Sequence, residues 1–320
     1  MEILPVTLGD IRAADARIRA HVKVTPMRAD PVLAGVLLKQ EYRQHTGAFK
    51  LRGATNAVLS LSPDALTRGV VTASTGNHGR ALAHAARAAG GRAVVCLSHL
   101  VPANKVQAIR DLGAEVRITG QSQDEAMQEV ARAVADEGLT EVPPFDHRDV
   151  VAGQGTLGLE ILADCPIPYA VLIPLSGGGL ASGVAMAVRA LSPQTRIIGL
   201  SMQRGAAMAS SLDAGHPVEV TELPTLADSL GGGIGLANRV TFAMCRALLD
   251  EVILLSEAEI AAAMRHIHAV TGDMVEGGGA VGVAAILSGR VAAQENTVCI
   301  LSGENVAADA FARVLKGESA

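Results

Sequence analysis

The chain has 320 residues, of which 49% are apolar, with 34 glycines, four phenylalanines, two tyrosines and no tryptophan. This length allows one large domain or two moderate ones and is short for three. A core of Ala, Val, Leu and Ile is typical of α/β proteins, in which helices cover a mostly parallel sheet. The net charge is −5 and the basic residues form no cluster, so we expect no nucleic-acid partner.

The predicted elements alternate between short β-branched runs and alanine-rich helices. An apolar run at 36–38 precedes a helix that we expect to begin near Lys50, with Thr46 as its cap. The next block resembles a compact open-sheet unit of its own. It comprises predicted strands at 69–73, 93–97 and 114–118 and predicted helices at 76–89, 102–112 and 123–136.

Two prolines at 143 and 144 interrupt the alternation, which then resumes. Residues 206–235 are glycine-rich and less regular. The remaining predicted elements are strands at 171–175, 196–201, 252–254 and 297–301, helices at 155–163, 180–191, 240–249, 257–269 and 280–287, and a final helix. This order predicts two domains with a cleft between them: a large domain of 1–68 and 147–320, and a small domain of 69–146 inserted in it.

Residues 170–188 carry no charged side chain and are long enough to span a bilayer. Pro174 and the glycines at 177–179 divide this stretch into a short strand and a separate helix. We interpret it as buried α/β core and expect no membrane association. The N-terminus lacks a basic segment followed by an apolar stretch, so no secretory signal is expected.

The cysteines are far apart in the sequence and form no Cys-x-x-Cys pair, so we expect buried, reduced thiols and a cytoplasmic protein. They are Cys96, Cys165, Cys245 and Cys299.

Lys50 lies in the run TGAFKLRGA at 46–54. A lysine at the start of a helix, above a buried strand, can form a Schiff base with an aldehyde cofactor, and desolvation lowers its pKa enough to free the amine. Most lysines are solvated surface residues. The function of Lys50 therefore depends on whether other segments supply a phosphate site and a partner for an aromatic ring nitrogen.

A glycine-rich segment joins the predicted strand at 171–175 to the helix after it. Its residues are Ser176, Gly177, Gly178, Gly179 and Leu180. Glycines let backbone N–H groups approach an anion, and the helix N-terminus adds its positive end, so this segment is a candidate phosphate site. A tight turn is the alternative. The segment is neither a P-loop nor a dinucleotide fingerprint, because no Gly-Lys-Ser/Thr and no G-x-G-x-x-G is present there.

A second loop ends the strand at 69–73 and opens the next helix. It contains Ser74, Thr75, Gly76, Asn77 and His78. Exposed amides at a helix N-terminus suit a substrate carboxylate, and the Asn77 amide could bond a phenolic or carbonyl oxygen. A well-capped helix would have the same sequence.

Ser302 follows the last predicted strand, where its hydroxyl can donate to a ring nitrogen or cap the final helix. Glu276 precedes the glycines at 277–279, and we expect it to face the cleft. We interpret the glycine runs at 231–233 and 277–279 as turns. The remaining histidines show no metal-ligand spacing, and we expect the last two to lie on a solvated helix face; they include His45, His147, His266 and His268.

Together these motifs resemble the fold-type-II pyridoxal-phosphate (PLP) enzymes of the threonine dehydratase and serine racemase family, in order along nearly the whole chain. The resemblance implies two open, mostly parallel sheets flanked by helices, PLP as cofactor, an amino-acid-like substrate and a homodimer. It makes Lys50 the Schiff-base residue and places Asn77 near the phenolic oxygen of the cofactor. The segment 176–180 would hold the phosphate, although the family usually has glycine at Ser176, and Ser302 would bond the pyridine nitrogen.

Further family landmarks are the segments 153–156 and 226–228, and the cofactor-binding set would include Phe49 and Glu276. Three stretches, at 73–80, 201–208 and 229–235, resemble the hydroxyectoine-utilisation dehydratases. Racemase-like members bind a divalent cation through acidic residues after the strand matching 196–201. Because 201–207 contain no carboxylate, we predict no metal at that site.

The resemblance places the second-face acid or base of the racemases at Thr75, which keeps a hydroxyl group and leaves racemisation open. The chain ends soon after the catalytic domain, so we expect no C-terminal regulatory domain. A neutral serine at the ring nitrogen gives a weaker electron sink than a carboxylate and favours β-elimination. We therefore expect a PLP-dependent dehydratase of β-hydroxy amino acids or a hydroxyectoine-derived compound. The alternatives are a racemase or O-substituted-serine lyase, and a regulator that binds ligand without chemistry.

Overall fold

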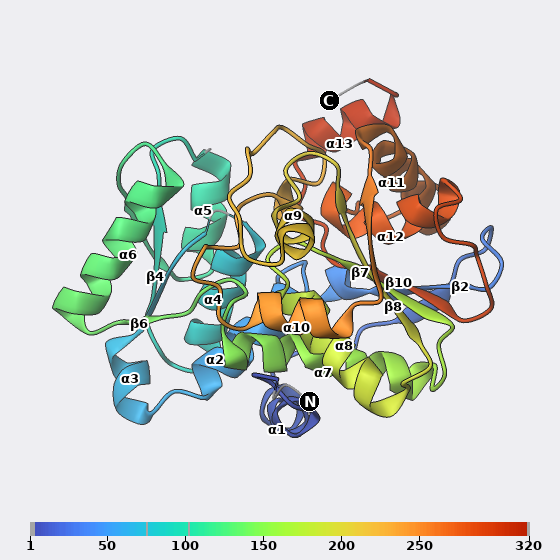
Figure 1. Ribbon diagram of the computed structural model, residues 1–320. Helices are drawn as coiled ribbons and strands as arrows, with labels where there is room; N and C mark the ends of the chain where they lie inside the picture. Colours follow the sequence, from blue (N-terminus) through green and yellow to red (C-terminus); the bar gives the residue numbers. More distant parts are fainter. Residues whose placement is uncertain (1–3, 75, 102, 319–320) are drawn as a thin grey trace.

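The computed structural model describes residues 4–74, 76–101 and 103–318, which form two sheets flanked by helices (Figure 1). The larger sheet has the strand order β1-β2-β10-β7-β8-β9, and the smaller one β5-β4-β3-β6. Strand β1 is antiparallel to β2, and the other pairs between these strands are parallel. The predicted α/β class is confirmed.

The strands of the larger sheet are β1 (Met27–Ala29), β2 (Val36–Gln40), β7 (Ala170–Pro174), β8 (Arg196–Met202), β9 (Glu251–Leu255) and β10 (Thr297–Leu301). Those of the smaller sheet are β3 (Val70–Ala73), β4 (Ala93–Leu97), β5 (Glu115–Ile118) and β6 (Thr140–Glu141).

The helices are α1 (Leu8–Ile18), α2 (Lys50–Leu59), α3 (Pro63–Arg68), α4 (Asn77–Ala88), α5 (Ala103–Asp111), α6 (Gln123–Glu137), α7 (Arg148–Asp164), α8 (Gly179–Leu191), α9 (Ala207–Ala214), α10 (Thr241–Leu248), α11 (Glu257–Thr271), α12 (Gly277–Leu287) and α13 (Ala308–Leu315), with 3-10 turns η1 (Glu41–Arg43) and η2 (Asp228–Leu230).

Each sheet is covered on both faces because successive strand residues point to opposite sides. In β7, Val171 packs with residues of α1, α7, α8 and α10, whereas Leu172 packs with residues of α11, α12 and α13. In the smaller sheet, Val70 packs with α2, α4 and α5, and Val71 packs with α6. Helix α2 contacts both α4 and α7, so it lies where the packing of the two sheets meets.

Helix α7 begins at Arg148, seven residues before the predicted start at 155. Glycines at 153, 155 and 158 lower the helix propensity of this segment, but close packing requires them. A Cβ at Gly153 would lie 2.6 Å from the carbonyl oxygen of Arg52, and one at Gly158 would lie 2.8 Å from Cβ of Ala187. Tertiary contact with α2 and α8 therefore overrides the local preference.

The glycine run at 277–279 is not a turn, contrary to the prediction, but the first turn of α12. A Cβ at Gly279 would lie 2.8 Å from a methyl carbon of Val275, so the helix begins against its own preceding segment. Helices α1, α3 and α9 and strand β1 were not predicted. The helix α9 lies inside the region 206–235, which the sequence indicates only as irregular.

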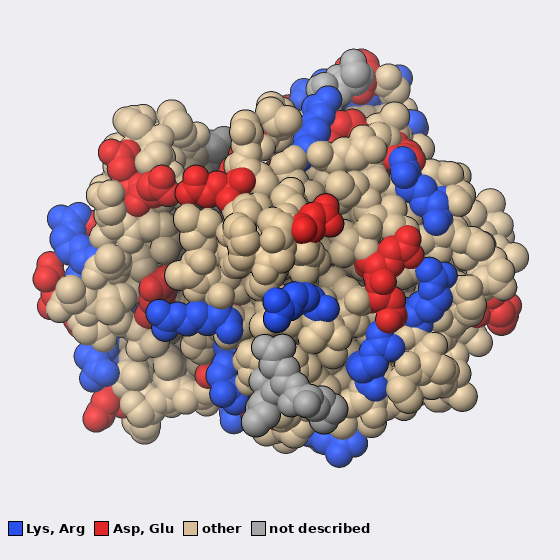
Figure 2. Space-filling view, viewed as in Figure 1, with Lys and Arg blue, Asp and Glu red and all other residues tan. Residues whose placement is uncertain are grey.

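All four cysteines are free and buried, as predicted. On the face shown in Figure 2, Lys and Arg lie in small separate groups among acidic and uncharged residues. In the part of the chain that the structure describes, no helix combines the length and the apolar character needed to cross a bilayer.

Candidate active site

Lys50 is the first residue of α2, and its side chain is only partly exposed. Its Nζ donates a hydrogen bond of 2.7 Å to the carbonyl oxygen of Pro144 and lies 5.3 Å from the centre of the Phe49 ring. Loss of hydration lowers the pKa of the Lys50 amine to about 8, against the opposing charge of Glu276. At pH 7 about a tenth of the amine is therefore uncharged and able to accept a proton.

Thr46 does not cap α2, contrary to the prediction. The N-cap residue is Phe49, and no side chain accepts from the first amides of the helix. The Oγ1 of Thr46 is buried without a hydrogen-bond partner, while its carbonyl oxygen accepts from Nδ2 of Asn305 at 3.0 Å. The start of α2 therefore carries no capping side chain where Lys50 enters the site.

Residues 175–178 connect β7 to α8, and no side chain caps the N-terminus of α8. Gly178 is the N-cap residue with φ of +87°, in the left-handed region that favours glycine. A Cβ at Gly178 would lie 2.8 Å from Cε of Met208, and one at Gly177 would overlap the ring of Phe145. Backbone N–H groups at the positive end of α8 are thus free of capping side chains, which fits a phosphate group.

The two ends of this segment differ in what they can offer a ligand. Ser176 is half-buried and lies two residues after the end of β7. The side chain of Leu180 is buried in the core formed by α1, α7, α8 and α10, so only its backbone N–H can contribute to an anion site. Phe145 contacts the positions of Gly177 and Gly179 and follows the residue that accepts the Lys50 hydrogen bond. The segment therefore lies close to Lys50.

Asn77, at the first turn of α4, is held from two sides. Its Nδ2 donates to Oε1 of Glu276 at 2.9 Å, and its Oδ1 accepts from Nδ2 of Asn305 at 2.5 Å. Glu276 is 3% exposed. Burial raises the pKa of Glu276 to about 7, against the hydrogen bonds from Ser229 and Asn77. The structure thus brings Asn77 from the smaller sheet's layer against Glu276 at the start of α12. That Glu276 faces a cleft between two domains stays a prediction.

The remaining residues of the second loop are placed in different ways. His78 is buried, with Nε2 2.8 Å from the carbonyl oxygen of Val142 and Nδ1 without a partner. Burial lowers its pKa to about 3, and the nearby charge of Lys50 adds to this. Since a carbonyl oxygen only accepts, Nε2 carries the proton and Nδ1 is a free acceptor. Ser74 and Gly76 are partly exposed beside it, and Thr75 lies outside the described residues.

Ser302 follows β10 and is buried. Its carbonyl oxygen accepts from the backbone N–H of Phe49 at 3.0 Å, and the carbonyl of Gly303 accepts from the backbone N–H of Glu276 at 3.0 Å. A Cβ at Gly303 would lie 2.6 Å from Oε1 of Glu276. These contacts bring the predicted residues Phe49, Lys50, Asn77, Glu276 and Ser302 together from four separate segments.

Several residues of this arrangement were not predicted. Asn305 bridges Thr46 and Asn77 and also contacts the guanidinium of Arg80. It lies in the same loop as Ser302, and that position after a central strand is the signal that points to it. The backbone carbonyl group of Pro144 could not be predicted from the sequence, because every residue has a backbone carbonyl group.

The histidines other than His78 do not join these residues. Contrary to the prediction, His266 and His268 are half-buried and bonded rather than solvated: Nε2 of His266 lies 2.8 Å from Oδ2 of Asp30, and Nδ1 of His268 lies 3.1 Å from the carbonyl oxygen of Asp273. His45 stacks on His84, with ring centroids 5.6 Å apart.

Comparison with known proteins shows which family the chain resembles. Residues 18–303 match the family described as pyridoxal-phosphate dependent enzyme. The chain is 56% identical to a putative threonine dehydratase of Sinorhizobium fredii, over 99% of this chain and 97% of that protein. It is 41% identical to an L-threonine ammonia-lyase of Geobacter sulfurreducens, over 95% of this chain and 76% of that protein.

Two solved structures have the same fold. The processed form of threonine deaminase isoform 2 from Solanum lycopersicum superposes with a TM-score of 0.90 at 34% identity, covering 97% of this chain and 91% of that one. Maize serine racemase superposes with a TM-score of 0.90 at 30% identity, covering 98% of this chain and 97% of that one.

The class of protein defined by this fold and these matches is the PLP-dependent enzymes. Within it, the chain belongs to the fold-type-II family of threonine dehydratases and serine racemases, and it is a PLP-dependent lyase. The predicted resemblance and cofactor are confirmed, and the alternative of a non-catalytic regulator is wrong. The uncapped α8 and the glycines packed against Phe145 and Met208 fit the phosphate of this cofactor.

Proposed function

We propose that this enzyme removes water from a β-hydroxy amino acid and releases a 2-oxo acid and ammonia. The observation that carries the proposal is the Lys50 amine, whose pKa falls to about 8 beside Pro144 and Glu276. A general base works best when its pKa lies near the working pH. The dehydratase and ammonia-lyase relatives support the same reaction type.

For the cofactor, we assign the backbone N–H groups of Gly177, Gly178, Gly179 and Leu180, with Ser176, to the phosphate. Asn77 would donate to the phenolic oxygen and Ser302 to the ring nitrogen, and Phe49 and Glu276 would lie beside the ring. Bound PLP supplies the electron withdrawal that makes the substrate's Cα proton acidic.

For the substrate, the start of α4 provides the anion site. The backbone amides at Gly76, Asn77 and His78, with the side chains of Ser74 and Thr75, bind the carboxylate. The uncapped first turn of α4 supports this assignment. Lys50 then takes the proton from Cα of the substrate and gives it to the β-hydroxyl group, which leaves as water. A water molecule hydrolyses the resulting enamine to the 2-oxo acid and ammonia. Ser302, as a neutral hydroxyl, does not hold a proton on the ring nitrogen, so elimination is favoured over transamination.

The favoured substrate is a hydroxyectoine-derived compound, with threonine and serine as simple alternatives. The support is the likeness of the stretches 73–80, 201–208 and 229–235 to hydroxyectoine-utilisation dehydratases. A racemase, or an O-substituted-serine lyase, is the second candidate; the likeness to maize serine racemase favours the former. We also propose a cytoplasmic homodimer in which 69–146 form a small domain inserted between 1–68 and 147–320.

Two measurements test the proposal. Purified protein titrated with PLP should gain the visible absorbance of a lysine-bound cofactor, and Lys50→Ala should abolish it. The loaded enzyme is then assayed for ammonia and 2-oxo acid with threonine, serine, 3-hydroxyaspartate and hydroxyectoine, with chiral separation of the remaining amino acid. Ammonia release supports a dehydratase, whereas inverted amino acid without ammonia contradicts it and supports the racemase.

A further inference from the structure

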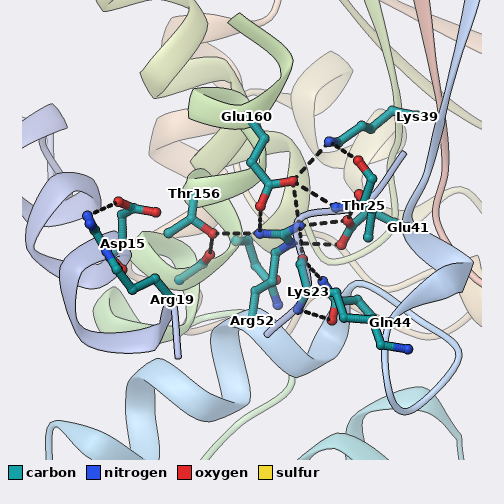
Figure 3. Close-up of polar contacts among 12 residues, drawn as sticks. Asp15, Arg19, Lys23, Thr25, Lys39, Glu41, Gln44, Arg52, Thr156 and Glu160 are labelled. Atoms are coloured by element: carbon teal, nitrogen blue, oxygen red, sulfur yellow. Dashed lines mark hydrogen bonds and ion pairs between the residues drawn. The ribbon is translucent and has the colours of Figure 1, made fainter. Parts of the chain in front are cut away.

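A cluster of buried charges lies behind the lysine helix, centred on Arg52 (Figure 3). Arg52 is 1% exposed. Its Nε and Nη2 donate to the two carboxylate oxygens of Glu41 at 2.8 Å each. Its Nη1 and Nη2 donate to the two oxygens of Glu160 at 2.7 and 2.9 Å. The guanidinium is therefore held by two bidentate carboxylates, the geometry in which arginine bonds are strongest and most directional.

The cluster is closed around these three residues. Lys39 is completely buried, and its Nζ lies 2.9 Å from Glu160 and donates at 2.7 Å to the carbonyl oxygen of Thr25. The two cations and two carboxylates of this set, which we call the Arg52 cluster (Lys39, Glu41, Arg52 and Glu160), have opposite and equal formal charges. Burial opposes ionisation of Glu160, but the adjacent Arg52 and Lys39 outweigh it and hold its pKa below the usual range.

The Arg52 cluster joins four elements, of which α7 is distant from the other three in the sequence. Lys39 lies on β2, Glu41 on the turn η1 that follows it, Arg52 on α2 and Glu160 on α7. Figure 3 shows Glu160 and Glu41 reaching the same guanidinium from these different elements. Helix α2 is thereby held both to the turn η1 that follows β2 and to α7.

Arg52 and Lys50 share one turn of α2 and lie on opposite sides of it. Residues two positions apart on a helix are separated by about 200° around its axis. Accordingly the Arg52 side chain reaches Glu160, whereas Lys50 reaches Pro144. The helix has no room to slide, because a Cβ at Gly53 would lie 2.7 Å from the carbonyl oxygen of Val150.

We propose that Arg52, clamped by Glu41 and Glu160, is a positioning residue that fixes the direction in which Lys50 presents its amine to the site. A buried ion cluster contributes little net stability compared with apolar side chains of the same size, but it defines one orientation. An apolar contact at position 52 would hold α2 in the core without fixing its rotation. The cluster thus keeps the Lys50 amine against Pro144 and away from water.

The test uses Arg52→Lys and Glu160→Gln in the cofactor-free and the PLP-loaded full chain. Arg52→Lys keeps the charge but loses the planar fork, and Glu160→Gln keeps the shape but loses a charge. The pH dependence of Lys50 acetylation, read by mass spectrometry in the cofactor-free protein, reports the pKa of its amine. Ile260 is a buried residue of α11 remote from α2, so Ile260→Ala is the control for general destabilisation. Arg92 lies in an exposed ion-pair group, so Arg92→Lys is the control for replacing an arginine by a lysine.

We expect the Lys50 pKa to rise from about 8 towards the ordinary 10.5 in both cluster variants, and kcat to fall about 10- to 100-fold with little change in KM, since small misplacement of a reacting group is costly. Both controls should keep the wild-type Lys50 pKa. An unchanged Lys50 pKa in folded Arg52→Lys and Glu160→Gln would overturn the proposal, whatever their melting temperatures.

The kinetic part rests on the proposed role of Lys50, but the acetylation readout does not. If Lys50→Ala kept its activity, the proposed function would fail while a shift of the Lys50 pKa in the cluster variants would still support the positioning of the side chain.

Discussion

The two sides of helix α2 satisfy their polar groups to different degrees. Behind the helix, the Arg52 cluster is saturated: each nitrogen of the guanidinium donates to at least one acceptor within 3.3 Å. In front of it, Oγ1 of Thr46 and Nδ1 of His78 are buried without partners. Nε2 of Gln154, on α7 where that helix packs against Gly53, is a third buried atom without a partner. Buried polar atoms are normally paired, and the exceptions need a reason. For Thr46 and His78 we propose a functional reason: the Arg52 cluster holds the helix, and these two atoms remain available to a bound ligand. The structure gives no such reason for Gln154.

The pKa shifts follow the same division. On the front, burial acts on groups that have no strong partner of opposite charge, so the pKa of Lys50 falls to about 8 and that of Glu276 rises to about 7. On the back, Glu160 is also buried, but its cationic neighbours hold its pKa low. Lys50 and Glu276 are therefore the groups whose pKa values suit proton transfer near neutral pH, whereas the residues of the Arg52 cluster stay charged.

The largest expected effect is on the front. Lys50→Ala should lower ammonia release by about 10³-fold or more, the upper part of the range for loss of a general base, without loss of stability, because it removes a poorly hydrated amine. The rate and the melting temperature are measured together. Lys316→Ala, at the end of α13, should retain wild-type activity; equal rates in both variants would contradict the role of Lys50.

The next effect is on the back. Glu41→Ala leaves Arg52 without one of its two buried carboxylates, so the free energy of unfolding should fall by about 3–5 kcal/mol. Denaturant titration measures it. For comparison, Asp309→Ala, which removes the exposed partner of Arg313, should cost less than about 1 kcal/mol. A loss below that level for Glu41→Ala would mean that the Arg52 cluster does not hold α2.

Glu276→Gln tests the raised pKa of Glu276 through the pH dependence of the free energy of unfolding. Because the folded-state pKa of Glu276 is raised from 4.5 to about 7, the folded protein binds the proton more tightly, and wild-type stability falls as pH rises through this window. The variant lacks this loss. Its stability relative to wild type should therefore increase from pH 4.5 to pH 7, by up to about 3 kcal/mol. A difference that is independent of pH would show that Glu276 titrates normally.

The smallest effect is expected at the phosphate segment. Gly178→Ala places a Cβ against Met208 and Cys245 in addition to the strain of a positive φ, so it should lower stability by about 1–3 kcal/mol and weaken PLP binding. Gly215→Ala has a similar φ of +78° but open space around it, so it isolates the strain and should leave PLP binding unchanged. Titration of each variant with PLP, followed by visible absorbance, distinguishes the effect of the added Cβ contact in Gly178→Ala from that of backbone strain alone in Gly215→Ala.

Local signals predicted much of this structure. Ser74, Ser176 and Ser302 follow strands as expected, because β-branched runs that end in Ser and Gly have a strong local pattern. The start of α7 was wrong because Gly153 and Gly158 oppose a helix locally while α2 and α8 require them.

Contacts between distant residues left no such pattern. Asn305 and Asn77 are 228 positions apart, and Arg52 and Glu160 are 108 apart, so one sequence does not reveal that they meet. Lys50 was predicted from its motif, whereas the Arg52 cluster that fixes its direction required the fold.

The most direct test compares the partly exposed Lys50 with the buried Lys39 in one experiment. Native, cofactor-free protein is acetylated from about pH 6 to pH 11, and the labelling of Lys50 and Lys39 is quantified peptide by peptide. Lys50 should react with a midpoint at about pH 8, whereas Lys39, with no exposed surface, should remain unlabelled until the protein unfolds. A Lys50 midpoint near 10.5, or labelling of both lysines in the native protein, would contradict the division between a saturated back and a reactive front.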